Sequence, residues 1–477
     1  MCGIVGLALG SEEYCATYEI LEALFQLQHR GQDAFGLSIV SRSRSVSVLR
    51  QKGLLTQISS AETIAQHDHG VMGLGHVRYK TSGSLHETNS QPLSLTGSHE
   101  IYLAHNGQVE VPTAPQGASY EESCRTDSHH ILKTFSDAME RPTAGSDLRS
   151  KVLSALSEIH RSCTGAFACV GIVDSCMLVG FRDAYGLKPL ILGKRADVGG
   201  TVSYIIASES VALEKLGYSI VRDVAPGEAI IIDRSTGKQR YSAHQVAPLK
   251  RNSLDVFELI YFARPEAVIN GISVHECRKL MGHALGRHIA RIMDAAELMS
   301  IDAIIPIPES GNISALALAQ ILRIPLQLGF HKNGYCNRSF IMPDARSRLK
   351  TIVRKLSAVR SEFDGKNLIL VDDSIVRGNT SREVVRMARN AGARKIVFAS
   401  CSPAIKFNHI YGIDLADEET LVANNRCEEQ VAREIGADRV VYLPVQSLVD
   451  QCLKPLKKDY GTENYEMGIF TGVYTTI

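Results

Sequence analysis

The 477-residue chain lacks the features that mark several large classes of protein. It has no run of ~18 apolar residues that could span a bilayer. Its N-terminus lacks the basic segment, apolar core and cleavage site of a signal peptide. The formal net charge is only +1, so no general field draws the chain to nucleic acid or to an anionic membrane. We therefore expect a protein that binds neither nucleic acid nor membranes.

Paired cysteines are also missing. The eleven cysteines are an odd number, and no two of them form a Cys-x-x-Cys pair. This pattern argues against a zinc ribbon or a disulfide scaffold and favours free thiols in a reducing compartment. The predicted location is cytoplasmic.

What is present divides into two halves with different patterns, as the length of the chain leads one to expect. In the first half, short apolar runs such as GIVGLAL at 3–9 alternate with Gly and Asn turns, and one helix is predicted over 16–28. This pattern predicts packed antiparallel sheets with helical cover. In the second half strands alternate with helices, which predicts a parallel α/β sheet. We place the domains at 2–240 and 241–477.

The first residues, MCGIVG, put a cysteine directly behind the initiator methionine. If Met1 is trimmed, Cys2 carries an α-amine beside its thiol, which places a base and a nucleophile on one residue. The reference pKa of an α-amine, near ~8, suits a base around neutral pH. The alternative is a cysteine–histidine dyad that uses His29, His76 or His105, and no spacing singles out one of these.

The sharpest motif of the second half is LILVDDSIVRGNTSREVV at 368–385. A buried strand delivers Asp372 and Asp373 at its carboxyl end, where parallel sheets bind ligands. Such a pair can hold sugar hydroxyls or a Mg²⁺ that partners a polyphosphate. The loop behind it enters a helix whose N-terminus suits a phosphate. A plainer interpretation makes Thr380 or Ser381 an ordinary N-cap and the aspartates solvated loop residues.

Two further stretches extend this site. PIPES at 306–310 ends a strand, and its Ser310 could offer a hydroxyl to the metal, although a helix N-cap is the alternative. The stretch 332–355 contains seven basic residues and only one acidic residue, Asp344. We interpret this basic stretch as a flap that closes over pyrophosphate.

Several motifs in the first half occur together. MCGIVG, LQHRGQDAFG at 27–36, GHVRY at 75–79, LAHNGQV at 103–109 and RTDSHHIL at 125–132 resemble class II glutamine amidotransferase domains. VDDSIVRGNTS resembles the motif of type I phosphoribosyltransferases. With RDAYGLKPL at 182–190, SESVAL at 208–213, PGEAI at 226–230, YFARPE at 261–266 and YGID at 411–414, the chain resembles the glutamine phosphoribosylpyrophosphate amidotransferase family over almost its whole length.

The resemblance implies a fold and a reaction. The first domain would be an N-terminal-nucleophile αββα sandwich and the second a type I phosphoribosyltransferase α/β domain. The enzyme would hydrolyse glutamine through a Cys2 thioester and pass the ammonia, along a passage between the sites, to C1 of phosphoribosylpyrophosphate (PRPP) with Mg²⁺. The products would be glutamate, pyrophosphate and 5-phosphoribosylamine, in the first step of purine synthesis. A homodimer or homotetramer inhibited by purine nucleotides is implied as well.

The resemblance also assigns roles to residues. The catalytic residues would be Cys2, Gly31, Asn106 and Gly107, and glutamine would be bound by Arg30, Arg78, Thr81 and Asp127. PRPP would be bound by Lys332, Asp372, Asp373, Ser374, Arg377, Gly378, Asn379 and Thr380, and the metal by Ser310, Asp372 and Asp373.

Some positions depart from the family pattern. They include Ala184, Tyr185 and Lys188 in RDAYGLKPL, Gly334 and Asn337 in the flap, and Asn379 in the phosphate loop. These changes leave two alternative interpretations open: a diverged paralogue that serves a specialised pathway, or a non-catalytic regulatory paralogue. An asparagine or glucosamine-6-phosphate synthase is a further alternative, but neither needs a phosphoribosyl loop. Since Cys2 directly follows Met1 and Cys452 has no close partner, we expect neither a propeptide nor an iron–sulfur cluster.

Overall fold

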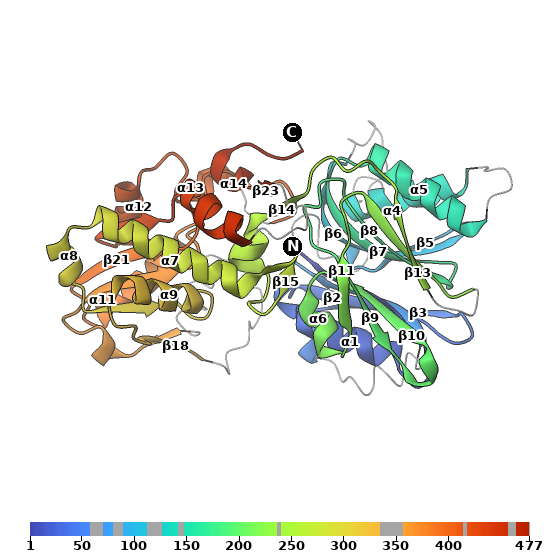
Figure 1. Cartoon of the computed structure of the whole chain (residues 1–477), viewed down its shortest axis with the longest axis horizontal. Helices are drawn as coiled ribbons and strands as arrows, with labels where there is room; N and C mark the ends of the chain where they lie inside the picture. The colour runs from blue at the N-terminus through green and yellow to red at the C-terminus, as the bar shows by residue number, and fades with distance from the viewer. Residues whose placement is uncertain are drawn as a thin grey trace.

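The computed structural model describes residues 1–57, 70–79, 89–111, 126–141, 147–235, 240–333, 356–413, 417–456 and 464–476. The chain forms two domains side by side, and the N-terminus lies at the junction between them (Figure 1). The predicted order, a sandwich of antiparallel sheets followed by a parallel α/β domain, is confirmed.

The first domain contains two antiparallel sheets. Within the described residues one has seven strands in the order β11-β9-β10-β1-β4-β2-β3, and the other has six in the order β13-β12-β8-β7-β6-β5. The strands of the first sheet are β1 (Gly3–Ala8), β2 (Ala34–Val40), β3 (Val46–Lys52), β4 (Met72–Arg78), β9 (Ile191–Ala196), β10 (Val202–Ala207) and β11 (Ser219–Asp223). Those of the second are β5 (Leu93–Thr96), β6 (Glu100–Val109), β7 (Gly165–Val173), β8 (Met177–Arg182), β12 (Glu228–Asp233) and β13 (Arg240–Gln245).

Helices cover the outer faces of both sheets. Helices α1 (Ala16–Leu27) and α6 (Ser210–Lys215) pack on the first sheet, and α4 (Asp127–Met139) and α5 (Leu148–Ser162) pack on the second (Figure 1). A third apolar core lies between the two sheets, with side chains such as Ile4, Leu74 and Val170. Because side chains alternate between the two faces of a strand, those on one face enter this shared core and those on the other face pack against the covering helices. The result is the four-layer αββα arrangement.

The second domain is built on a parallel sheet in the order β17 (Ala303–Pro306), β20 (Asn367–Asp372), β21 (Lys395–Ser400) and β22 (Arg439–Tyr442). Helices α7 (Val274–Ile292) and α9 (Asn312–Leu322) cover one face, and α11 (Asn379–Asn390) and α12 (Glu428–Ile435) cover the other. Neighbouring strand residues face opposite cores, as Ile304 and Ile305 do. This explains the continuous apolar runs of these strands.

The predicted domain boundary falls inside a strand. Strand β13 begins at Arg240 and pairs with β12 along its whole length, so the second sheet of the first domain continues to Gln245. The segment looked unpatterned because β13 is an edge strand, whose polar side chains meet solvent. The second domain begins at β14 (Ser253–Asp255), which pairs in parallel with β23 (Asn464–Glu466) near the C-terminus.

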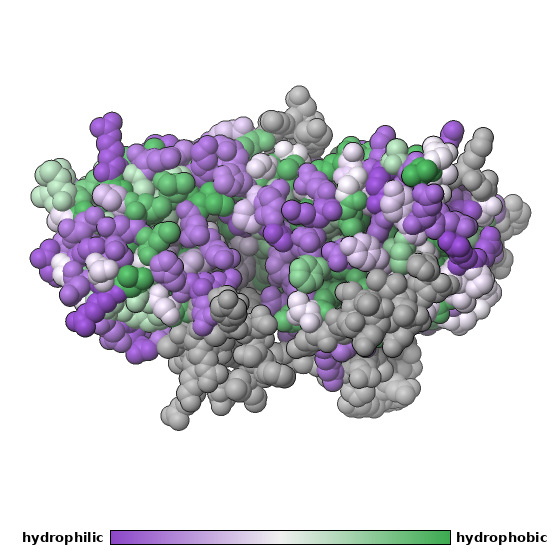
Figure 2. All heavy atoms as spheres, turned by 90° about the horizontal axis from the view of Figure 1, so that it is seen from below, coloured by the Kyte–Doolittle hydropathy of each residue, from purple (hydrophilic) through white to green (hydrophobic). Residues whose placement is uncertain are grey.

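On the face seen in Figure 2, hydrophilic and hydrophobic residues are interspersed over the described parts of both domains. No helix among the described residues is long and apolar enough to cross a membrane.

Candidate active sites

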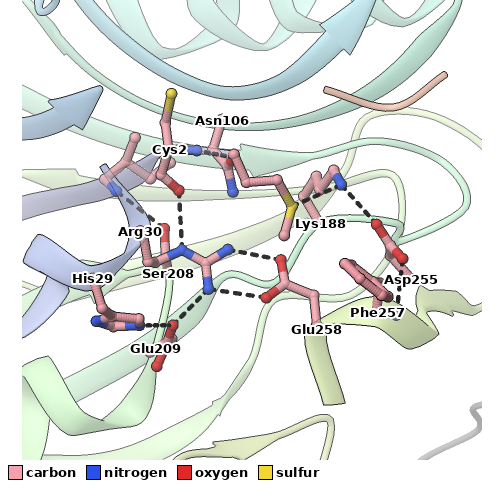
Figure 3. Close-up of polar contacts among 12 residues, drawn as sticks. Cys2, His29, Arg30, Asn106, Lys188, Ser208, Glu209, Asp255, Phe257 and Glu258 are labelled. Carbon is pink, nitrogen blue, oxygen red and sulfur yellow. Dashed lines mark hydrogen bonds and ion pairs between the residues drawn. The ribbon is translucent and has the colours of Figure 1, made fainter. Parts of the chain in front are cut away.

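Cys2 stands at the entrance to β1, where the two sheets of the first domain face each other. Its backbone N–H donates to Oδ1 of Asn106 on β6 at 3.0 Å (Figure 3). Its Sγ lies 3.8 Å from the Tyr79 carbonyl oxygen. The bond from Cys2 to Asn106 joins residues 104 apart in the chain. The fold thus brings the predicted nucleophile directly against a predicted oxyanion donor.

Asn106 has the geometry of an oxyanion donor. Its side chain is fully buried, its Oδ1 is taken by Cys2, and its Nδ2 has no hydrogen-bond partner among the described residues. A buried donor without a partner costs about 1–3 kcal/mol, so folds rarely keep one without a use. The amide is therefore available to a substrate oxygen beside Cys2.

The glycines at this site are required by close backbone contacts. Gly107 has a φ of 149°, and a Cβ there would lie 2.0 Å from the Ala166 carbonyl oxygen on the neighbouring strand. A Cβ on Gly31 would lie 2.5 Å from the carbonyl carbon of Arg78. Neither position has room for a side chain, because neighbouring backbone lies against it.

Two of the predicted glutamine-binding residues lie on elements next to those that carry Cys2 and Asn106. Arg78 ends β4 and is buried, and Asp127 begins α4 with a carboxylate that accepts from the Ser128 N–H at 2.8 Å. Asp127 also accepts from the Val109 N–H at 3.4 Å, at the end of β6. Thr81 lies outside the described residues. The glutamine-binding roles of these residues stay predictions.

Arg30 lies between Cys2 of the first domain and Glu258 of the second. Its guanidinium is fully buried; Nε donates to the Cys2 carbonyl oxygen at 3.0 Å, Nη2 donates to Glu258 at 2.7 Å, and Nη1 is shared between Glu209 and Glu258 (Figure 3). Burial lowers the pKa of Arg30, but Glu258 and Glu209 outweigh that effect and raise it. All of its nitrogens are bonded to protein, and Nε supports the backbone of Cys2. Its predicted role in binding glutamine stays a prediction.

The alternative of a cysteine–histidine dyad finds no support in the contacts. His29 Nε2 is bonded to Glu209 at 2.7 Å, and His105 Nδ1 to Ser128 at 3.0 Å. Burial lowers the pKa of His76 to about 3 and also lowers that of His105. Within the described residues none of the three histidines is hydrogen-bonded to the Cys2 thiol.

Met1 is buried between the domains. Its side chain is 1% exposed, and burial lowers the pKa of its α-amine to about 5. Its sulfur lies 2.9 Å from Lys188 Nζ, which forms an ion pair with Asp255 at 2.8 Å (Figure 3). Asp255 also bonds His409 at 2.8 Å. Lys188, one of the departures from the family pattern, is therefore an interdomain contact.

The second predicted site lies at the carboxyl end of β20. Asp372 and Asp373 are each 7% exposed, and Asp373 is hydrogen-bonded to the Ser310 and Ser374 side chains. Burial and the neighbouring Asp373 carboxylate raise the pKa of Asp372 well above its usual range. Burial also raises the pKa of Asp373, which Ser310 and Ser374 partly offset. Because two buried negative charges repel each other, this pair of carboxylates favours the binding of a cation.

The loop after this pair leads into α11, as predicted. Gly378 precedes the helix with a φ of 73°, a conformation that favours glycine. Asn379 and Thr380 form its exposed first turn, and Asn379 Oδ1 accepts from Arg382 at 3.2 Å. Arg377 is half-buried in the loop.

The predicted flap can be followed only at its start. Lys332, on β18 (Phe330–Lys332), pairs with Glu309 at 3.3 Å, beside Ser310. The segment 334–355, with Gly334 and Asn337, lies outside the described residues.

Sequence reasoning missed the carboxylates at the domain junction. Glu209 and Glu258 lie 179 and 228 residues from Arg30, and Asp255 lies 67 residues from Lys188. Pairs so far apart in the chain leave no periodic pattern. The only signal was that Glu209 belongs to the quoted SESVAL motif.

The chain is similar to known proteins over its whole length. A family model of class II glutamine amidotransferases matches residues 1–184. The amidophosphoribosyltransferase of Saccharomyces cerevisiae is 39% identical, with 100% of this chain and 92% of the relative covered. That of Escherichia coli (strain K12) is also 39% identical, with 100% and 93% covered.

Two solved structures are similar over the whole chain. One is glutamine PRPP amidotransferase from B. subtilis complexed with ADP and GMP, with a TM-score of 0.82, 29% identity and coverage of 100% of this chain and 98% of that one. The other is the allosteric regulatory enzyme of purine biosynthesis, with a TM-score of 0.82, 31% identity and coverage of 100% and 96%. The chain belongs to the amidophosphoribosyltransferase family, the glutamine-dependent enzymes of the first step of purine synthesis.

Proposed function

We propose that this amidophosphoribosyltransferase divides its reaction between two sites, with Cys2 as the nucleophile of the first and Asp372 and Asp373 at the centre of the second. The observation that carries the proposal is the pair Cys2–Asn106. Asn106 holds the Cys2 backbone with its oxygen, and its buried Nδ2 has no hydrogen-bond partner among the described residues. A thiol beside a buried, unpaired amide donor is suited to attack on a side-chain amide.

At the first site the Cys2 thiolate attacks the glutamine side-chain carbonyl carbon. The developing oxyanion accepts from Asn106 Nδ2 and from the Gly107 N–H. Arg78 binds the α-carboxylate of glutamine through its fork, and Asp127 binds the α-ammonium. Collapse of the tetrahedral intermediate releases ammonia and leaves a thioester on Cys2, which water then hydrolyses to glutamate.

The base of this step is the Cys2 α-amine, which requires the removal of Met1. With Met1 in place the Cys2 nitrogen is a peptide nitrogen that donates to Asn106 and cannot take a proton. Because Met1 is buried between the two domains, an aminopeptidase reaches it only before the domains close around it.

At the second site the ammonia displaces pyrophosphate from C1 of PRPP. Among the described residues no group of three or more His, Cys, Asp or Glu side chains could hold a metal alone. Two carboxylates with Ser310 instead suit a Mg²⁺ that arrives with substrate phosphates, since Mg²⁺ is commonly held by one or two carboxylates and phosphates. Bound there, Mg²⁺ would neutralise charge on the pyrophosphate. Ser374, Arg377, Gly378, Asn379 and Thr380 hold the 5-phosphate at the α11 N-terminus, and Lys332 faces the pyrophosphate.

For regulation and assembly, our proposal is based on the relatives of this chain. A relative binds ADP and GMP, and we propose purine nucleotides as inhibitors of this enzyme too. We further propose a homodimer or homotetramer in the cytoplasm, where the free thiols of the described cysteines stay reduced.

The proposal is tested with two nitrogen sources. Pyrophosphate release from PRPP and Mg²⁺ is measured with glutamine and with ammonium, for the wild type and for Cys2→Ala. We expect Cys2→Ala to lose the glutamine reaction and to keep the ammonium reaction. If Cys2→Ala still uses glutamine, another nucleophile acts. If the wild type releases no pyrophosphate from either source, the assignment of the second site is wrong.

A further inference from the structure

A cavity of about 500 Å³ lies outside both candidate active sites. Its wall comes from four parts of the chain: the end of α5 with the start of β7, the turn after β8, the segment 246–250 between β13 and β14, and Thr476 near the C-terminus. The volume falls in the range of about 300–1,000 Å³ that is typical of small-molecule sites. No residue assigned to glutamine, PRPP or the metal lines the cavity, so neither substrate accounts for it.

Two positions that depart from the family pattern, Ala184 and Tyr185, line this cavity. They lie in the turn after β8, which is fixed by Asp183: its buried carboxylate accepts from the N–H groups of Tyr185 at 2.9 Å and Phe167 at 3.3 Å. Asp183 is the only acidic residue among the described residues that line the cavity, and the backbone satisfies its carboxylate. We therefore expect a ligand that is specific to this chain and that is not cationic.

Three aromatic rings contribute to the wall. The His160 ring on α5 packs against Phe167 on β7 with the ring centroids 5.1 Å apart, and Tyr185 supplies the third ring. Burial, and then the charge of Lys250, lowers the pKa of His160 to about 4, so this ring is neutral at pH 7. The His160 Nε2 is buried and has no hydrogen-bond partner among the described residues. Uncharged rings of this kind favour a flat aromatic ligand.

Lys250 supplies a positive charge at the same cavity. Its backbone N–H donates to the Ala184 carbonyl oxygen at 3.1 Å, and its Nζ lies 5.2 Å from the centre of the Tyr185 ring. The side chain is exposed and forms no ion pair with any described residue, whereas Arg161, the other cation of the wall, is paired with Glu158 at 2.5 Å. The Lys250 ammonium is therefore available to an anionic group of a ligand.

We propose that this cavity binds a small aromatic anion, a flat ring that bears a carboxylate or a sulfonate, with the ring against Tyr185 and His160 and the anionic group on Lys250. The proposal goes beyond the amidotransferase reaction and depends on neither active site. Thr476 is tied to Tyr411 of the second domain by a hydrogen bond of 2.9 Å, so the wall includes parts of both domains. A ligand there binds the folded two-domain chain and stabilises it by mass action.

The test uses two dyes that share one ring framework. Anilinonaphthalene sulfonate carries a single negative charge, and phenylnaphthylamine is the same framework without the sulfonate. Both are titrated into the full chain by fluorescence, with PRPP and Mg²⁺ present so that the PRPP site is filled. We expect the wild type to bind the sulfonate dye about 10- to 100-fold more tightly than the neutral dye, since hydrogen bonds to charged groups are the stronger ones.

Three variants locate the dye. Lys250→Gln removes the charge and should weaken binding of the sulfonate dye about 10- to 100-fold, with the neutral dye unchanged. Ser157→Phe, on α5, places a ring in the cavity and should abolish binding of both dyes. Lys215→Gln makes the same charge change at an exposed position on α6, across the sandwich from α5, and should bind both dyes as the wild type does. Glutamine and ammonium turnover should stay at wild-type values in all three.

Three results would overturn the proposal. One is equal affinity of the sulfonate dye for the wild type and Lys250→Gln. Another is dye binding that survives in an active Ser157→Phe enzyme. The third is an equal loss in Lys215→Gln, which would make net charge rather than the cavity responsible. If Ser157→Phe does not fold, Tyr185→Ala takes its place: it removes one ring of the wall and should weaken both dyes, and unchanged binding of both would equally contradict the proposal.

Discussion

The most informative single change is Asn106→Ala, because Asn106 meets Cys2 with one atom and keeps the other for the substrate. Removing Nδ2 deletes one of two donors to the oxyanion, and loss of such a donor costs about 10²- to 10³-fold in kcat, or about 2.7–4 kcal/mol. The effect on folding is expected to be small. The change removes the acceptor of the Cys2 N–H at 3.0 Å, but it also removes a buried amide without a partner.

The assay is glutamate release at saturating glutamine, with ammonium-dependent pyrophosphate release as the control for folding. Asn106→Asp separates the two atoms, since it keeps the acceptor for Cys2 and replaces the donor by an oxygen. Its kcat should fall at least as far as that of Asn106→Ala. A loss of less than about tenfold in either variant would refute the oxyanion role of Nδ2.

Three other changes test separate parts of the structure. Gly107→Ala, whose Cβ would lie 2.0 Å from the Ala166 oxygen, should lose glutamine turnover and keep the ammonium reaction. Normal glutamine turnover would show that the strand can shift enough to accommodate the Cβ. Asp373→Asn should weaken PRPP–Mg²⁺ binding about 10- to 100-fold by calorimetry, and an unchanged Kd would remove Asp373 from that site. For Glu209, burial raises the pKa but His29 and Arg30 lower it to about 2, so its contribution to stability is present above about pH 4.5 and is lost as pH falls toward 2. The melting temperature of Glu209→Gln, measured from pH 6 to pH 3, should be lower at pH 6 and fall less steeply than that of the wild type; parallel curves would contradict the pairing.

Local pattern was enough to predict much of this protein. The helix expected over 16–28 is α1 (Ala16–Leu27), and the strand–DD–loop–helix stretch folds as β20, a loop and α11. Each depends on residues close together in the chain, where period, turn glycines and helix N-termini can be read directly. The edge strand β13 was missed because its solvent-facing residues look like a linker.

Contacts between distant residues were decided by the tertiary structure alone. By itself the sequence predicted which residues carry the chemistry: a cysteine at position 2, an Asn-Gly pair, which the structure places inside β6, and an aspartate pair ahead of a phosphate loop. Only the packing of the two domains decided that Arg30 would support Cys2 through Glu258 and that Lys188 would meet Asp255. The physical reason is that a buried cation needs a carboxylate, but any carboxylate the fold delivers will serve, so the partner cannot be found from the sequence around the cation.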